Sequence, residues 1–364
     1  MSVEFIGFVG FQHSSEIHPA IGPVLDAAYV ETLAKAHQDG GFDRVLVAFH
    51  SVSADSIIVA AHVAAAAPRL GLMIAHRPGF AAPTVAARQL ATLDQLTGGR
   101  VAVHIITGGS DQELAKDGDH LTKDERYART DEYLDIVRQE WTSPKPFDYD
   151  GKYYQVKGAF GAVKPAQKPH LPIYFGGSSD AAIPVAGKHA DIYALWGETY
   201  AQVRDTIARV RAAAAKSGRN PRFSLSLRPV LAETEAAAWR RARDIEDRTR
   251  ALREQAGLHT DGHAPANAGS QRLLAAAAEG RRLDKRLWTG VAALTGAAGN
   301  STGLVGTPEQ VAEALLDYYD LGVTTFLIRG FDPLDDAVAY GRDLIPLVRA
   351  LVAEREANPE RVAS

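Results

Sequence analysis

The sequence predicts an α/β protein in which eight parallel strands close into a (β/α)8 TIM barrel. Short apolar runs alternate along the chain with longer, alanine-rich amphipathic segments, and each run is followed by a helical pattern. The runs are almost continuously apolar, as strands are when helices cover both faces of a parallel sheet. A strand and helix repeated in this way is the pattern of such a barrel.

The expected strands and helices alternate in order along the chain. We expect strands at 3–9, 44–49, 70–76, 101–107, 171–176, 191–196, 223–231 and 324–330. We expect helices at 25–39, 54–66, 82–97, 122–141, 179–188, 199–217, 308–320 and 332–353. The alternative is a doubly wound sheet, whose first strand would normally be followed by a Gly-x-Gly-x-x-Gly turn. Residues 10–19, GFQHSSEIHP, hold no such turn.

Two stretches interrupt the repeat. Residues 143–170 contain Pro, Gly and aromatic residues without a helical period, and predict an ordered excursion before the fifth strand. Residues 234–305 are longer than the connection between the last two strands needs, and they begin with a charged helix. We interpret their Gly-rich end, 289–305, as a mobile lid, and the alternative is a plain surface loop. With these insertions, residues 1–364 are expected to form one domain.

The composition limits the classes of partner. A formal net charge of -4 gives the chain no long-range attraction to nucleic acid or to an anionic membrane. No apolar stretch reaches the roughly 18 residues that a membrane span needs. There is no cysteine, so disulfides and thiolate chemistry are excluded. We expect a soluble, cytoplasmic protein with no nucleic-acid or membrane partner.

Polar side chains gather where the expected strands end, which is the edge at which such barrels carry their active sites. They are Gln12, His13, His50, Ser51, Ser53, His76, Arg77, Thr107, Ser178, Ser179, Glu198, Arg228 and Arg329. This set favours recognition of anions and hydrogen-bonding groups. It lacks the carboxylate pair of glycosidases and the His-x-His pattern of metal-dependent hydrolases, so we predict no metal site.

The segment LPIYFGGSSDAA, residues 171–182, ends an apolar run with two glycines and two serines. Glycine lets the backbone turn sharply or approach a ligand closely. If a helix begins near Ser179, its free N–H groups and the hydroxyls of Ser178 and Ser179 converge on a volume that suits a phosphate. The alternative is a serine N-cap with nothing bound.

Several stretches taken together resemble the alkanesulfonate monooxygenases of the bacterial-luciferase-like flavin-dependent family. They are HRPGFAAPTVAARQLATLDQLTGGRVAVHIITGG, KDERYARTDEYL, QKPHLPIYFGGSSDAA, LWGE and TGLVGTPEQVAEALLDYYDLGVTTFLIRGF. The resemblance runs from the first expected strand to the last helix. The motifs Thr-Gly-Gly, Glu-Arg-Tyr and Phe-Gly-Gly-Ser-Ser follow one another in order at fitting separations.

This resemblance implies a two-component monooxygenase. Reduced FMN would come from a separate NAD(P)H-dependent FMN reductase and would use O2 to oxygenate a small organic substrate. In the alkanesulfonate enzymes sulfite and an aldehyde leave. Gly177, Ser178 and Ser179 would hold the FMN phosphate. Tyr127 would reach the phosphate or ribityl region, and Thr107 would hydrogen-bond the flavin ring. A homodimer or homotetramer is expected, as in the family.

The chain departs from these enzymes on the substrate side. Where they carry an Arg-x-His pair on the seventh strand, this chain has Ser226 and Arg228. Phe331 stands in place of a tyrosine and Ser53 in place of a cysteine, and the expected lid lacks its arginine. Linear alkanesulfonates are therefore one option beside other sulfonates, sulfones, and other organosulfur or carbonyl compounds.

The remaining candidates have catalytic or substrate-binding roles. We expect Arg228 to stabilise negative charge, and its alternative is an ion pair with a strand-end carboxylate such as Glu198. His13 would donate a hydrogen bond and Trp196 would wall the site. The expected substrate-binding set is His50, Ser53, Arg77, Ser226 and Phe331. Arg77 would meet an anionic substrate or pair with a carboxylate of the insertion, His76 could be structural or functional, and His104 is expected to be structural.

Two other functions stay open at this point. One is a deazaflavin-dependent oxidoreductase of the same superfamily, which transfers hydride without oxygen. The other is a flavin-binding protein without catalysis, which the missing histidine and tyrosine would permit.

Overall fold

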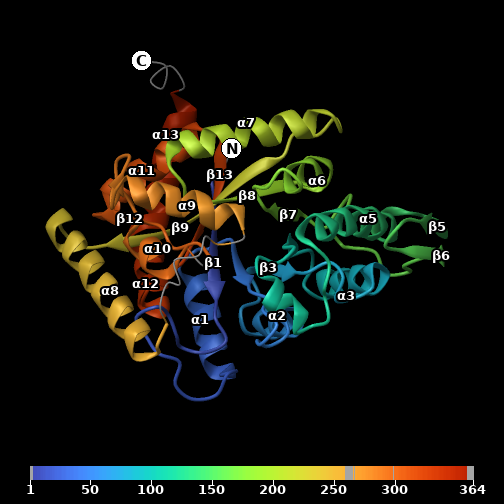
Figure 1. Cartoon of the computed structure of the whole chain (residues 1–364), viewed down its shortest axis with the longest axis horizontal. Helices are drawn as coiled ribbons and strands as arrows, with labels where there is room; N and C mark the ends of the chain where they lie inside the picture. Colours follow the sequence, from blue (N-terminus) through green and yellow to red (C-terminus); the bar gives the residue numbers. More distant parts are fainter. Residues whose placement is uncertain (1–2, 259–264, 266, 298, 359–364) are drawn as a thin grey trace. The chain divides into compact units, whose positions relative to one another are not determined.

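The computed structural model describes residues 3–258, 265, 267–297 and 299–358 of the chain. Each expected strand is present: β1 (Glu4–Val9), β2 (Arg44–Val47), β3 (Gly71–His76), β4 (Val101–Ile105), β7 (Ile173–Gly176), β8 (Ile192–Trp196), β9 (Arg222–Leu231) and β13 (Val323–Ile328). They hydrogen-bond in the order β9-β13-β1-β2-β3-β4-β7-β8, and β8 pairs with β9 as well. The strands therefore form a closed parallel barrel with helices between them, and the predicted fold class is confirmed (Figure 1).

Helices follow the strands close to the expected positions. They are α1 (Ala27–Asp39), α2 (Ser56–Ala66), α3 (Pro83–Leu96), α5 (Lys123–Thr142), α6 (Ala182–His189), α7 (Tyr200–Ala215), α11 (Pro308–Asp320), α12 (Pro333–Ala339) and α13 (Ile345–Ala357). Several of them begin at side-chain caps that the sequence encodes, such as Asp55 before α2 and the capping boxes of Thr122 and Thr307. The single helix expected at 332–353 is instead α12, a π-helical turn at Tyr340–Leu344 and α13.

The chain divides into two compact units, which are described separately. The first unit comprises Met1–Val45, Ala194–Ile207 and Arg222–Ser364. The second unit comprises Leu46–Tyr193 and Ala208–Pro221. The expectation that 1–364 is one domain stays a prediction.

The first unit contains the long insertion before β13. It forms α8 (Glu235–Gln255), α9 (Ala268–Glu279), β10 (Arg282–Leu283), β11 (Leu287–Trp288), α10 (Gly290–Thr295) and β12 (Gly303–Gly306). Strand β12 pairs in parallel with the end of β9, and α8 lies beside α10 and β12 (Figure 1). Thr302, just before β12, donates a hydrogen bond of 2.6 Å to the carbonyl of Gly197. The stretch 289–305, apart from residue 298, which lies outside the described residues, thus holds α10 and most of β12; its role as a lid stays a prediction.

The second unit contains the excursion before β7, which is ordered as expected. Within it, β5 (Phe147–Asp150) and β6 (Gln155–Ala159) form an antiparallel hairpin. The Glu132 carboxylate on α5 holds the hairpin turn, since it accepts hydrogen bonds from the backbone N–H groups of residues 152, 153 and 154. Strands β3, β4 and β7 run parallel in this unit, with Ile105 of β4 opposite Phe175 of β7.

Among the described residues, no helix combines the length and the apolar character that crossing a membrane requires.

Candidate functional site

The turn after β7 brings most of the predicted phosphate-binding residues together in the second unit. Gly177 has φ 128°, a conformation that side-chain-bearing residues rarely adopt. A Cβ added there would lie 2.5 Å from the Tyr127 hydroxyl oxygen, so that hydroxyl reaches the glycine backbone directly. The Tyr127 side chain is 7% exposed and packs near Phe175 of β7. Glycine is therefore required here by both the backbone conformation and the tyrosine.

The two serines after Gly177 have different environments. The Ser179 hydroxyl accepts a hydrogen bond of 3.3 Å from the backbone N–H of Ala182, and the Ser179 carbonyl accepts from the same N–H at 3.0 Å. Ser179 therefore caps the turn that leads into α6, which begins at Ala182 rather than near Ser179 as predicted. The Ser178 hydroxyl oxygen is buried and has no hydrogen-bond partner among the described residues.

An unpartnered buried hydroxyl costs free energy unless a ligand completes it. Ser178 follows the carboxyl end of a barrel strand, where such folds bind ligands, and it is the next residue after Gly177, which the Tyr127 hydroxyl approaches. Because the Ser178 hydroxyl is buried, the turn would have to open for a phosphate oxygen to accept a hydrogen bond from it. The residues at this turn therefore fit a phosphate group such as that of FMN.

Thr107 belongs to the same edge of the second unit. It follows β4 by two residues, just as Gly177 follows Phe175, and Phe175 lies opposite Ile105. Thr107 and Gly177 therefore leave neighbouring strands at the same level. The Thr107 side chain is half-buried, which leaves its hydroxyl able to meet a ligand.

Tyr193 on β8 is a member of this region that the sequence argument missed. Its hydroxyl donates a hydrogen bond of 2.5 Å to the Gly177 carbonyl, and its side chain is 1% exposed. Tyr193 thus holds the backbone of the turn after β7 at Gly177. A buried tyrosine requires a hydrogen-bond partner for its hydroxyl, and this requirement is the signal that could have identified it.

Three predicted substrate-binding residues lie in the second unit. Arg77 is 4% exposed and pairs at 2.8 Å with Glu113 of α4 (Asp111–Ala115), so its partner is not in the insertion. Burial alone would raise the pKa of Glu113. Hydrogen bonds from Arg77 and from the backbone N–H of Ser51 outweigh burial, so the pKa of Glu113 is lowered. His50 is exposed and lies 3.5 Å from the same carboxylate. The Ser53 hydroxyl donates to the His50 carbonyl at 2.9 Å, and this bond closes a local turn.

Two histidines of the second unit have structural positions. His76 Nε2 lies 2.6 Å from the Tyr133 hydroxyl oxygen. Burial lowers the pKa of His76 and of His104 to about 4. Both rings are therefore neutral near pH 7 and form part of the packed strands.

Arg228, on β9 in the first unit, is paired. Its Nη1 donates to Glu16 at 2.6 Å and its Nη2 donates to the Gly330 carbonyl at 2.9 Å. The guanidinium carbon lies 3.5 Å from the centre of the Phe331 ring. The expected alternative partner, Glu198, instead binds Arg272 of α9 at 2.7 Å.

Glu16, in the loop after β1, is the second residue that the sequence argument missed. Burial raises its pKa, but the charge and hydrogen bond of Arg228, helped by Arg329, outweigh burial and lower the pKa to about 2. Arg329 Nη2 lies 3.6 Å from the same carboxylate. A buried arginine at a strand end requires an acidic partner, but pattern alone could not indicate which one.

The other first-unit candidates differ in exposure. Trp196 is half-buried and packs against Leu273, Ala292 and Ala297 of the insertion. His13 is exposed, with its ring 4.8 Å from the ring of His18. Ser226 is half-buried on β9. Phe331 is 0% exposed beneath Arg228 and Trp288, so contact with a substrate would require these side chains to move.

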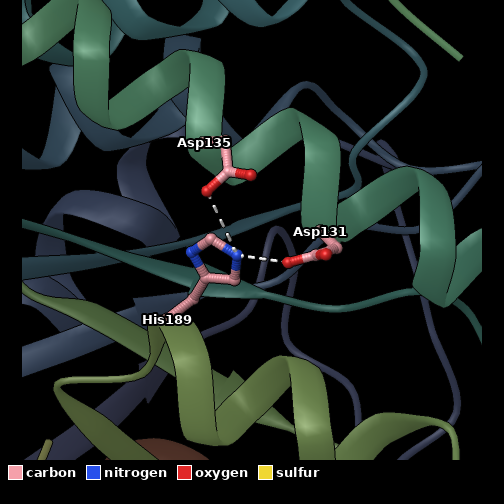
Figure 2. A group of neighbouring side chains, drawn as sticks. All are labelled: Asp131, Asp135 and His189. Carbon is pink, nitrogen blue, oxygen red and sulfur yellow. Dashed lines mark hydrogen bonds and ion pairs between the residues drawn. The ribbon is translucent and has the colours of Figure 1, made fainter. Parts of the chain in front are cut away.

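A separate charged cluster joins α5 to α6. Figure 2 shows Asp131 and Asp135 of α5 directed toward the His189 ring, whose Nε2 lies 2.7 Å from Asp131. The Lys188 ammonium lies 2.8 Å from each carboxylate and supplies the positive charge that they need. The His189 Nδ1 is buried on the side of the ring away from the carboxylates. The cluster therefore reads as an ion-pair network between two helices.

Comparison with known proteins agrees with the barrel fold. A riboflavin lyase, in a structure with modified FMN and riboflavin, aligns at a TM-score of 0.80 and 20% identity, covering 96% of this chain and 92% of that one. EDTA monooxygenase from Chelativorans sp. BNC1 aligns at 0.77 and 20% identity, covering 96% and 94%. An F420-dependent secondary alcohol dehydrogenase aligns at 0.70 and 16% identity, covering 96% and 99%. The model of the luciferase-like monooxygenase family matches residues 3–325, and this chain therefore belongs to that family.

Proposed function

We propose that this protein is the oxygenating component of a two-component monooxygenase that uses reduced FMN and O2. The observation that carries the proposal is the buried Ser178 hydroxyl, which has no partner among the described residues and directly follows Gly177, the glycine that the Tyr127 hydroxyl approaches. Membership of the luciferase-like monooxygenase family supports it. A separate NAD(P)H-dependent FMN reductase would be the partner that supplies the reduced cofactor.

The residues of the second unit would hold the cofactor. Ser178 and Tyr127 would donate hydrogen bonds to the phosphate, and Gly177 would let the Tyr127 hydroxyl lie close to the turn. Ser179 would act mainly by holding the turn, because its hydroxyl already accepts from Ala182. Thr107 would donate to the flavin ring. Reduced FMN, when bound, supplies the electrons that activate O2.

The substrate we propose first is an organosulfonate, oxygenated with release of sulfite and an aldehyde. In the first unit, Arg228 and Arg329 share one carboxylate, so this cluster carries an excess positive charge that suits an anionic substrate. His13 and Trp196 remain the proposed hydrogen-bond donor and apolar wall. The cytoplasmic location and the homodimer or homotetramer expected from the sequence stay predictions.

The test measures O2 consumption and product formation with FMN, NADH and an added flavin reductase. A panel of alkyl, aryl and sugar sulfonates, assayed for sulfite, is expected to include a substrate whose oxygenation is coupled to O2 uptake. If O2 uptake is coupled instead to oxygenation of a compound that is not a sulfonate, the protein is still a monooxygenase but the proposed substrate class is wrong. Hydride transfer from reduced F420 without O2 uptake would favour the function named for the F420-dependent neighbour. FMN binding with no turnover on any compound would indicate a binding protein.

A further inference from the structure

Two arginines and one carboxylate meet at strand ends of the first unit. Arg228 lies on β9 three residues before its end at Leu231, Arg329 follows β13 directly, and Glu16 lies in the loop after β1. Glu16 is 2.6 Å from Arg228 and 3.6 Å from Arg329. Because one carboxylate faces two guanidinium groups, the cluster carries one positive charge in excess. A partly buried excess charge is costly unless a counter-charge accompanies it.

The two guanidinium groups are not equivalent. Arg228 is 1% exposed, and both of its Nη atoms already donate to protein oxygens. The Phe331 ring lies 3.5 Å from its guanidinium carbon. Arg228 therefore has no accessible face for a ligand. Its contacts hold the Glu16 carboxylate in place.

Arg329 retains donors that these contacts leave unused. Its side chain is 31% exposed, and its Nη2 makes only long contacts among the described residues, 3.4 Å to the Asn300 carbonyl and 3.6 Å to Glu16. Burial, and then repulsion from Arg228, lower the pKa of Arg329 to about 10, so it remains charged at neutral pH. A guanidinium with free N–H groups on one edge matches the paired oxygens of a carboxylate or sulfonate.

We propose that Arg329 binds the anionic group, a carboxylate or sulfonate, of a small organic substrate. Glu16 is a positioning residue that faces its guanidinium, and Arg228 holds the Glu16 carboxylate in place. The role of the bound anion as the substrate of an oxygenation rests on the proposed function. The binding step itself requires only the first unit's own side chains.

The test measures binding by isothermal titration calorimetry, without turnover. The probes are 1-hexanesulfonate, hexanoate and neutral 1-hexanol, titrated into the protein with saturating oxidised FMN and without it. The wild type should bind one or both anions more tightly than the alcohol. Loss of the charged hydrogen bonds in Arg329→Gln should weaken anion binding by roughly tenfold to a hundredfold and leave 1-hexanol unchanged. The two anions distinguish a sulfonate from a carboxylate preference.

Arg342→Gln is the matched control, because Arg342 is 70% exposed, lies in the same unit and changes the net charge equally. It should bind the probes as the wild type does. Arg329→Lys keeps the positive charge but lacks the planar guanidinium with its paired N–H donors, so its anion affinity should be intermediate. If Arg329→Gln does not fold, the anion affinity of Arg329→Lys is the test of the proposal. Anion binding that is absent in the wild type, or unchanged in both Arg329 variants, overturns the proposal. Anion binding without any FMN binding would overturn the proposed function and leave the anion site standing.

Discussion

Replacing Ser178 with alanine should change stability and FMN binding in opposite directions. In the free protein the Ser178 hydroxyl is buried without a partner in the described part of the chain, so it contributes a desolvation cost. Alanine removes that hydroxyl and adds no new polar group. The free protein should therefore become no less stable. The same substitution removes a hydrogen-bond donor to the FMN phosphate.

The two effects have similar sizes. An unsatisfied buried hydroxyl costs roughly 1–3 kcal/mol, so the free energy of unfolding should stay equal or rise by about 1 kcal/mol after part of the packing is lost. A hydrogen bond to a charged phosphate contributes about 1.5–3 kcal/mol, which corresponds to FMN affinity weakened by roughly tenfold to a hundredfold. The opposite signs distinguish a ligand-binding serine from a structural one.

Urea unfolding of the free protein and quenching of FMN fluorescence give the two quantities. Ser179→Ala is the control, because the Ser179 hydroxyl accepts from the Ala182 N–H and its loss should cost about 1 kcal/mol of stability. If Ser178→Ala destabilises the free protein and leaves FMN affinity unchanged, the phosphate does not lie at this turn.

Other substitutions test the remaining contacts. Gly177→Ala should lose FMN binding and about 1–3 kcal/mol of stability, because φ is 128° and the added Cβ would lie 2.5 Å from the Tyr127 hydroxyl oxygen. A variant that binds FMN with the wild-type affinity would contradict this. Glu16→Gln leaves Arg228 buried without its counter-charge and should lower the free energy of unfolding by about 3–5 kcal/mol at pH 7. Since Glu16 has a folded pKa of about 2 against an ordinary 4.5, its contribution is complete above pH 4.5 and is lost as the pH falls toward 2, so urea titrations of the two proteins should converge over that range. His104→Leu should flatten the loss of stability between pH 6.5 and 4, because the unfolded chain takes up a proton in that range and the folded ring, with a pKa of about 4, does not; identical pH profiles would refute this.

The fold could be predicted because its signals are local. Apolar runs and N-caps lie within a few residues of the elements they define, and α11 has the bounds expected, Pro308–Asp320. The start of α6 was misplaced because Ser179 caps a turn that precedes the helix proper, and both arrangements place a serine after glycine.

The candidate site was predicted less completely because its contacts are distant in sequence. Arg228 and Glu16 are 212 positions apart, and the pattern around either residue indicates only that a partner is needed. Glu198, the partner expected for Arg228, is a strand-end carboxylate, but it is already paired with Arg272 of α9 in the insertion. Partner choice of this kind depends on which loops the folded chain brings together.

The position of Ser178 in the barrel indicates a ligand more strongly than its missing hydrogen-bond partner does. Other buried polar atoms among the described residues also lack partners, including the Thr324 and Tyr154 hydroxyls. Thr324 lies at the start of β13, the end of a barrel strand that carries stability rather than chemistry, and Tyr154 lies beside the β5–β6 hairpin. Ser178 alone of the three follows the carboxyl end of a barrel strand, next to Gly177, which the Tyr127 hydroxyl approaches. The backbone conformation and the tyrosine account for Gly177, but no contact within the described part of the chain accounts for the buried Ser178 hydroxyl, and a phosphate at this turn would.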